Sequence, residues 1–98
     1  MITKEKMQEL TREAKAKQME VNVVFAEKWF DSNMEEDFFA AAASGKTYIV
    51  FHVPEQVHIE ALRKVLGERG FRVELAEYGS IYYHYNLPEP QIVCHWFF

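Results

Sequence analysis

The segment from residue 45 to 86 constrains the fold of this chain more than any other, because strand-like runs flank a helical pattern. Residues 47–53 combine Tyr, Ile, Val and Phe and predict a strand. Residues 59–69 follow the three-and-four spacing of a helix with one apolar face. Residues 71–77 alternate apolar and polar side chains, and residues 81–86 predict the return strand of a hairpin. The order strand, helix, strand, strand indicates an α+β fold.

The side chains of these elements divide into an apolar face and an opposite face. The inward positions are Ile49, Phe51 and Val53 in the first strand, Ala61, Leu62, Val65 and Leu66 in the helix, and Phe71, Val73 and Leu75 in the second strand. A helix that joins two strands of one sheet makes a right-handed crossover, and the hairpin partner can then lie between them. We expect one small sheet covered by helices on one face. The open face would carry Tyr48, His52, Tyr82 and His84.

Residues 3–44 are predicted to be helical, because Lys, Glu, Gln, Ala and Met dominate the first part. Apolar residues at helical spacing mark one face, namely Met7, Leu10, Ala14, Val21, Val24, Phe25 and Trp29. Lys17 and Gln18 interrupt this stripe. The first three turns are therefore expected to project from the body and to pair with another chain or stay partly frayed.

Residues 31–33 leave two interpretations of this helix open. Ser32 and Glu35 have the spacing of a capping box, which favours a break and a restart. One long helix with a polar turn facing water fits the sequence equally well. Gly45 suits the left-handed position that ends the helical region.

The last residues form an extension beyond the central segment. The run Leu87–Pro90 contains two prolines, so it cannot continue a strand ladder and predicts a rigid joint. Residues 92–98 predict a last strand that is nearly all apolar and must be covered on both faces, by the domain or by a neighbour. We expect a single domain made of a helical arm (1–44), a β-α-β-β core (45–86) and this extension (87–98).

Composition excludes several classes of function. A net charge of −4 argues against binding to a nucleic-acid backbone, which requires clustered Lys and Arg. The single cysteine rules out an internal disulfide and fits a reducing compartment. No apolar run approaches the length of a membrane span, and no apolar segment marks a signal peptide. A cytoplasmic protein that contacts neither membranes nor nucleic acid is expected.

Three histidines, His52, His84 and His95, lie on predicted strands and could share the face away from the helices. Converging imidazoles would suit zinc. However, only Cys94 stands near one of them, and adjacent strand residues point to opposite faces. We therefore expect no metal and no cofactor. A cysteine within an apolar strand is typical of a buried, inert thiol and not of a nucleophile.

Two other motifs favour structural interpretations. The run Gly45–Thr47 matches part of a phosphate-binding loop, but Ala40 stands where the loop needs its upstream glycine, and a helix precedes it. The acidic residues of segment 31–37 suit a helix start and lack the glycine and alternating ligands of a calcium loop. No paired acid–base groups in a polar cleft emerge, so a non-enzymatic protein is expected.

Aromatic residues make up 15% of the chain and are the strongest functional feature. Interfaces favour Tyr, Trp and Phe with few charges at the centre. The predicted partner-binding residues are Tyr48, His52, Tyr82, His84, His95, Trp96 and Phe98. The alternative is that the first helix folds over this face and buries it. Both interpretations require the C-terminal segment to be packed.

The run Gly45–Thr47, the helix segment Ala61–Leu66, the turn Glu68–Val73 and the predicted hairpin resemble small uncharacterised proteins common in bacteriophage and prophage genomes. Those proteins share a long N-terminal helix, a strand, a helix and a terminal hairpin. The resemblance covers about residues 1–86 and implies a phage origin, with an accessory or virion-associated role. It brings no catalytic residues, and residues 87–98 depart from the pattern.

Together these features predict a non-enzymatic protein–protein interaction module of phage type. Its partners would be a second copy of the chain, as a homo-oligomer, or a host protein that it inhibits by occupying a basic channel. The alternatives are a small-ligand or metal-binding module on the histidine and tyrosine face, or a structural component of the virion.

Overall fold

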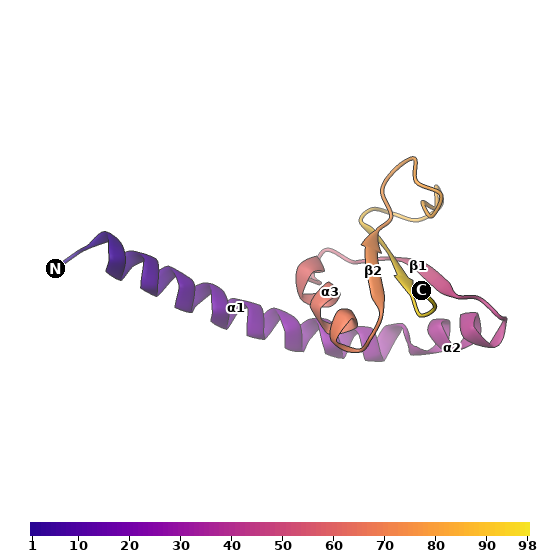
Figure 1. The fold of residues 1–98 in the computed structure, drawn as a ribbon, viewed down its shortest axis with the longest axis horizontal. Coiled ribbons are helices and arrows are strands. Elements are labelled where there is room, and N and C mark those ends of the chain that lie inside the picture. Colours follow the sequence, from indigo (N-terminus) through magenta and orange to yellow (C-terminus); the bar gives the residue numbers. More distant parts are fainter.

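The computed structural model describes residues 1–98 and has an α+β fold with one small sheet (Figure 1). The elements in chain order are α1 (Lys4–Asn33), α2 (Glu35–Ala43), β1 (Tyr48–His52), α3 (Ile59–Glu68), β2 (Arg72–Leu75) and β3 (Gln91–His95). The predicted fold class, a long N-terminal helix followed by strand, helix, strand and strand, is confirmed. None of the helices is long and apolar enough to cross a membrane.

The sheet has the strand order β1-β3-β2, so the last strand of the chain lies in the middle. Both neighbours run antiparallel to β3, with Ile92 opposite Phe51 on one side and Leu75 on the other. The prediction of a return strand at 81–86 is wrong, because these residues form turns and loop. Residues 91–94 are all buried, as a strand with two neighbours and two covered faces requires, and the tyrosine-rich segment is too polar for that position.

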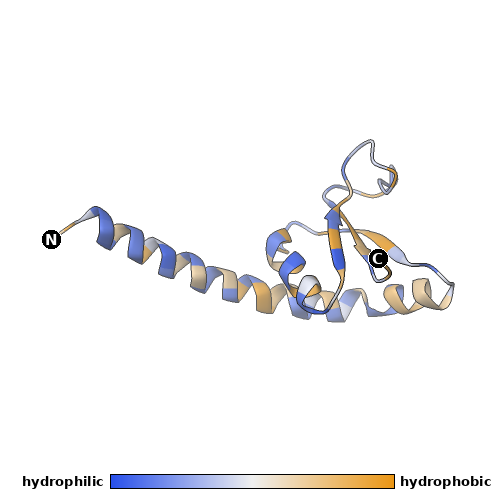
Figure 2. Cartoon of the chain, in the orientation of Figure 1, coloured by the Kyte–Doolittle hydropathy of each residue, from blue (hydrophilic) through white to orange (hydrophobic).

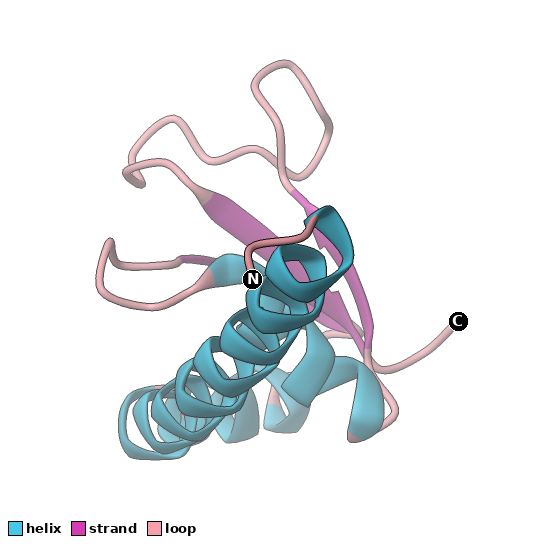
Figure 3. Ribbon diagram, turned by 90° about the vertical axis from the view of Figure 1, so that its left-hand side faces the viewer, coloured by secondary structure: helices cyan, strands magenta, loops and turns pink.

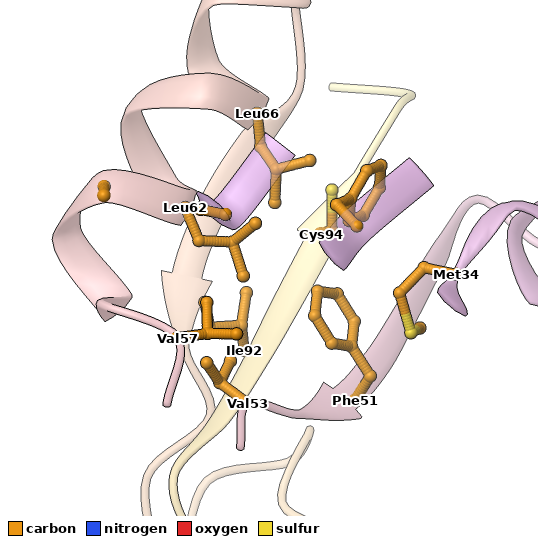
Figure 4. Close-up of a cluster of buried hydrophobic side chains, with 11 residues drawn as sticks. Met34, Phe51, Val53, Val57, Leu62, Leu66, Ile92 and Cys94 are labelled. Carbon is orange, nitrogen blue, oxygen red and sulfur yellow. The ribbon is translucent and has the colours of Figure 1, made fainter. Parts of the chain in front are cut away.

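The main core lies between one face of the sheet and the helices (Figure 4). Apolar side chains of α1 and α3 pack against this face of the sheet. The sheet contributes Phe51 of β1, Val53 just after β1, and Ile92 and Cys94 of β3. The residues of α3 in this layer are Ala61, Leu62 and Leu66, as its periodicity predicts. Figure 3 shows the helices gathered on one side of the strands and the long loops beyond the other side.

Only the second half of helix α1 packs against the core. Its buried stripe continues through Met19, Val23, Ala26 and Phe30, whereas residues 1–18 are all exposed. Consequently the molecule is elongated, with extents of 61 × 27 × 25 Å (Figure 1), and the projecting end is mostly hydrophilic (Figure 2). The apolar face read from the sequence differs from this core stripe. Of its members only Trp29 is half-buried.

The helical region breaks, but the second helix begins two residues later than the capping-box interpretation predicts, with Met34 in place of Ser32 as the residue before it. Met34 separates α1 from α2, and no side chain caps the start of α2. The Asn33 amide instead donates to the Trp29 carbonyl, 2.8 Å away. Met34 is buried in the core, so packing of this side chain accompanies the break. The end of α2 follows the prediction, with Gly45 at φ 83°.

Helix α3 is closed at both ends by local contacts. The His58 ring accepts a hydrogen bond from the Ala61 backbone N–H at 3.2 Å, and Gly70 takes φ 93° beyond the last turn.

An ion pair joins the end of α3 to α1. Arg69 binds both carboxylate oxygens of Asp31 on α1, at 2.7 and 3.0 Å. This hydrogen bonding holds the pKa of Asp31 below its usual value. Both side chains are substantially exposed, so the pair contributes little stability.

Candidate protein-interaction surface

The loop at residues 77–90 covers the sheet face opposite the helices. Because side chains alternate along β3, Gln91, Val93 and His95 point away from the core that holds Ile92. Val93 is nevertheless 0% exposed and Gln91 only 2%. The loop between β2 and β3 supplies this cover, since both Gln91 and His95 contact its residues. The second face of the sheet is therefore occupied within the chain.

Gln91 fixes this loop through three hydrogen bonds. The side-chain oxygen of Gln91 accepts a hydrogen bond from the His84 backbone N–H at 3.0 Å. Its amide nitrogen donates to the carbonyls of His84, at 2.8 Å, and Leu87, at 3.0 Å. A buried amide with its oxygen and nitrogen both engaged holds the middle of the loop at a defined distance from β3.

Further hydrogen bonds order the loop itself. The Tyr83 hydroxyl donates to the Glu89 carboxylate at 2.8 Å, which joins the two arms of the loop. This hydrogen bond, with the nearby negative charge, raises the pKa of Tyr83. Gly79 adopts φ 88° in the turn next to Tyr78, a conformation that favours glycine. The loop is longer than most connections in compact domains, and such loops are commonly functional.

The loop presents a cluster of three tyrosines at the surface. The ring centroids of Tyr78, Tyr83 and Tyr85 lie 5.1 to 5.7 Å apart in edge-to-face arrangements. Tyr78 is 75% exposed and Tyr85 72%, and the neighbouring Ile81 is 90% exposed. We call Tyr78, Ile81, Tyr83 and Tyr85 the tyrosine patch. This patch exposes a large aromatic surface to solvent on a loop that hydrogen bonds hold in place.

The structure brings three of the predicted partner-binding residues together. The ring of Tyr82 lies 5.0 Å from that of Tyr48 and 5.2 Å from that of His95, which belong to neighbouring strands. The His95 Nε2 atom lies 3.6 Å from a carboxylate oxygen of Glu74 and has no hydrogen-bond partner. These rings pack mainly on one another, so much of their area is used within the chain.

The other four predicted residues lie apart. The His52 ring donates from Nδ1 to the Pro90 carbonyl at 3.1 Å, and the exposed His84 takes part in the Gln91 contacts through its backbone. Trp96 points to the opposite side of the sheet, where its ring lies 5.8 Å from that of Phe38. Phe98 is 77% exposed at the C-terminus. The tyrosine patch contains none of the predicted partner-binding residues, although four tyrosines in eight residues before two prolines indicate an aromatic loop.

No cluster of three or more His, Cys, Asp or Glu side chains is placed to hold a metal ion. Cys94 is fully buried, and burial raises the pKa of its thiol to about 12, so the thiol is protonated at neutral pH. A groove of about 570 Å³ runs between the end of α2 and the edge of β1, with Asp37, Lys46 and His84 in its lining. These side chains form no hydrogen-bonded constellation with one another.

Comparison with protein-family models, with curated proteins and with solved structures finds no match to this chain.

Proposed function

We propose that this chain is a non-enzymatic protein-interaction module and that the tyrosine patch contacts its partner. The observation that supports this most strongly is the exposure of Tyr78, Ile81 and Tyr85 on a loop that Gln91 holds in place. Large exposed apolar side chains cost a protein solubility, so a cluster of them on an ordered loop favours a binding role.

The physics of such a surface suits a protein partner. Tyrosine supplies a large, amphipathic contact with few rotatable bonds, so little conformational entropy is lost when it is buried. Because hydrogen bonds already order the loop, the cost of fixing it on binding is reduced further. The only charged side chains in the loop are Glu77 and Glu89, and one of these is engaged by Tyr83. A partner with apolar pockets for these side chains and a weakly basic rim fits this composition.

The kind of partner follows from other features. The chain carries a net charge of −4, which favours basic protein surfaces. The resemblance to bacteriophage proteins is the support for a host protein as that partner and for inhibition as the outcome. A role in the virion would use the same patch against another virion protein.

An affinity capture from bacterial lysate tests this function. The wild-type chain and a triple variant, Tyr78→Ser, Ile81→Ser and Tyr85→Ser, are immobilised at equal density. We expect the wild type to retain a protein in stoichiometric amount and the triple variant to retain at least about tenfold less, since exposed aromatic anchors dominate interface energies.

The matched control replaces Phe97 and Phe98 with Ser, because these residues expose similar aromatic area outside the loop. This variant is expected to retain the same protein as the wild type. Equal retention by the triple variant, or loss only in the Phe97 and Phe98 variant, would contradict the assignment to the loop. Unfolding curves of all three chains establish that each is folded.

A further inference from the structure

Helix α1 carries a second apolar stripe that its own chain leaves uncovered. Its exposed members are Met7, Leu10, Ala14, Val21, Val24 and Phe25. With about 3.6 residues per helical turn, this stripe lies opposite the core stripe that contains Ala26 and Phe30. It therefore faces away from α3 and the sheet and continues along the projecting part of the helix.

The projecting part needs a partner to be a stable helix. Residues 4–18 make no buried contact, and an isolated helix of this length is marginal in water. The stripe follows a seven-residue repeat. The first apolar position of each heptad holds Met7, Ala14 and Val21, and the second holds Leu10 and Val24. This is the heptad spacing by which helices pair with one another.

We infer that α1 pairs with α1 of a second copy in antiparallel orientation. In this arrangement Met7 lies against the partner's Val24, Leu10 against the partner's Val21, and Ala14 against the partner's Lys17. The two symmetry-related central layers each pair Ala14 with Lys17, and all other layers are apolar on both sides. The small Ala14 leaves room for the aliphatic part of Lys17, whose ammonium group reaches the edge beside the partner's Glu13. The inference is independent of the function proposed for the tyrosine patch.

The distribution of charge selects the antiparallel orientation. Residues 4–17 contain five basic and three acidic side chains, whereas the rest of α1, residues 20–33, contains one basic and three acidic ones. Antiparallel pairing sets the basic half of each helix beside the acidic half of the other, with Lys6 next to the partner's Glu27. Parallel pairing would instead align the two acidic halves. It would also place the two Lys17 side chains against each other in the interface.

Sedimentation equilibrium of the full chain tests the pairing. We expect a dimer with a dissociation constant in the micromolar range, because the stripe is short and has a lysine at its centre. The double variant Leu10→Glu and Val24→Glu is expected to weaken dimerisation by about 100-fold or more, since it places charges in apolar layers. Both positions are exposed within one chain, so the fold of the monomer is retained.

The matched control adds the same two charges on the other side of the arm, as Gln8→Glu and Ala16→Glu. Both residues are exposed and point away from the stripe, so the dissociation constant is expected to change by less than about threefold. A monomeric wild type at millimolar concentration would overturn the inference. So would a dimer that the Leu10 and Val24 substitutions leave unchanged.

Disulfide trapping reports the orientation. A mixture of Met7→Cys and Val24→Cys chains is expected to give a cross-linked dimer under mild oxidation, and Met7→Cys alone is expected to remain uncross-linked. The native Cys94 is fully buried and does not compete. Arg12→Cys mixed with Val24→Cys is the negative control, because Arg12 lies on the opposite side of the helix. Efficient cross-linking of Met7→Cys to itself would show parallel pairing and overturn the inference.

Discussion

Replacing Gln91 with Leu is expected to lower the free energy of unfolding by about 2–4 kcal/mol. The substitution removes the partners of the His84 N–H and of the His84 and Leu87 carbonyls in a partly buried setting. Each polar backbone group left unsatisfied costs about 1–3 kcal/mol, and partial access of water to the loosened loop reduces the total. Chemical denaturation followed by circular dichroism measures the change.

The same substitution is expected to free the loop. Near-ultraviolet circular dichroism of the tyrosines should weaken, because Tyr78, Tyr83 and Tyr85 lose their fixed arrangement. Gln56→Leu is the control, since Gln56 is exposed and the change of side chain is identical. Its unfolding free energy should stay within about 0.5 kcal/mol of the wild type. If Gln91→Leu behaved like this control, Gln91 would not be the residue that holds the loop.

Replacing Ile92 with Ala is expected to cost about 3–5 kcal/mol. Ile92 is 0% exposed in the middle strand and lies in the core with Phe51 and Leu62. Truncation of an apolar side chain in such a site loses the transfer free energy and leaves a cavity that the neighbours fill only in part. Thermal or urea unfolding of the two chains, compared at one temperature, gives the difference.

Leu75 provides the matched control for this prediction. It is the register partner of Ile92 on the neighbouring strand β2, but it is 40% exposed. Leu75→Ala is therefore expected to cost about 1 kcal/mol or less, because less apolar area leaves the core. Equal costs for the two substitutions would contradict the central position of β3.

The apolar periodicities of α3 and β1 predicted these two elements and their buried faces correctly. The apolar stripe of α3 occupies its predicted positions, and Ile49, Phe51 and Val53 face the core side as their alternation requires. These predictions succeed because burial on one side of an element imposes its period on the sequence.

The middle strand and the loop could not be read in the same way. Residues 81–86 have strand propensity, but pairing depends on which segment fits a site buried on both faces, and residues 91–95 fit it better. That competition is decided by tertiary packing. The prediction that residues 92–98 form a strand covered on both faces holds for residues 92–94 but is wrong at the C-terminus, because β3 ends at His95 and Phe97 and Phe98 are 72% and 77% exposed. The sequence also did not specify that the cover comes from the preceding loop.

The candidate site was predicted in residue type more than in position. Tyrosines were expected at the surface, yet Tyr48 and Tyr82 pack with His95, which leaves Tyr48 40% exposed, and the most exposed rings are Tyr78 and Tyr85. In a strand at residues 81–86 the tyrosines would alternate between two faces of the sheet. In the folded loop their side chains do not alternate in this way. The hydrogen bonds of Gln91, which set the directions of the rings, link residues through the fold and leave no periodic pattern in the sequence.

Amide hydrogen exchange, followed residue by residue by nuclear magnetic resonance, tests both the sheet order and the position of the loop over β3. If β3 is the middle strand and the loop lies over it, consecutive amides from Ile92 to His95 should be protected as strongly as the centre of α3, because a middle strand bonds on both sides. Protection in β1 and β2 should alternate. Rapid exchange of Ile92 to His95, with continuous protection at residues 81–86, would contradict both the sheet order and the loop that presents the tyrosine patch.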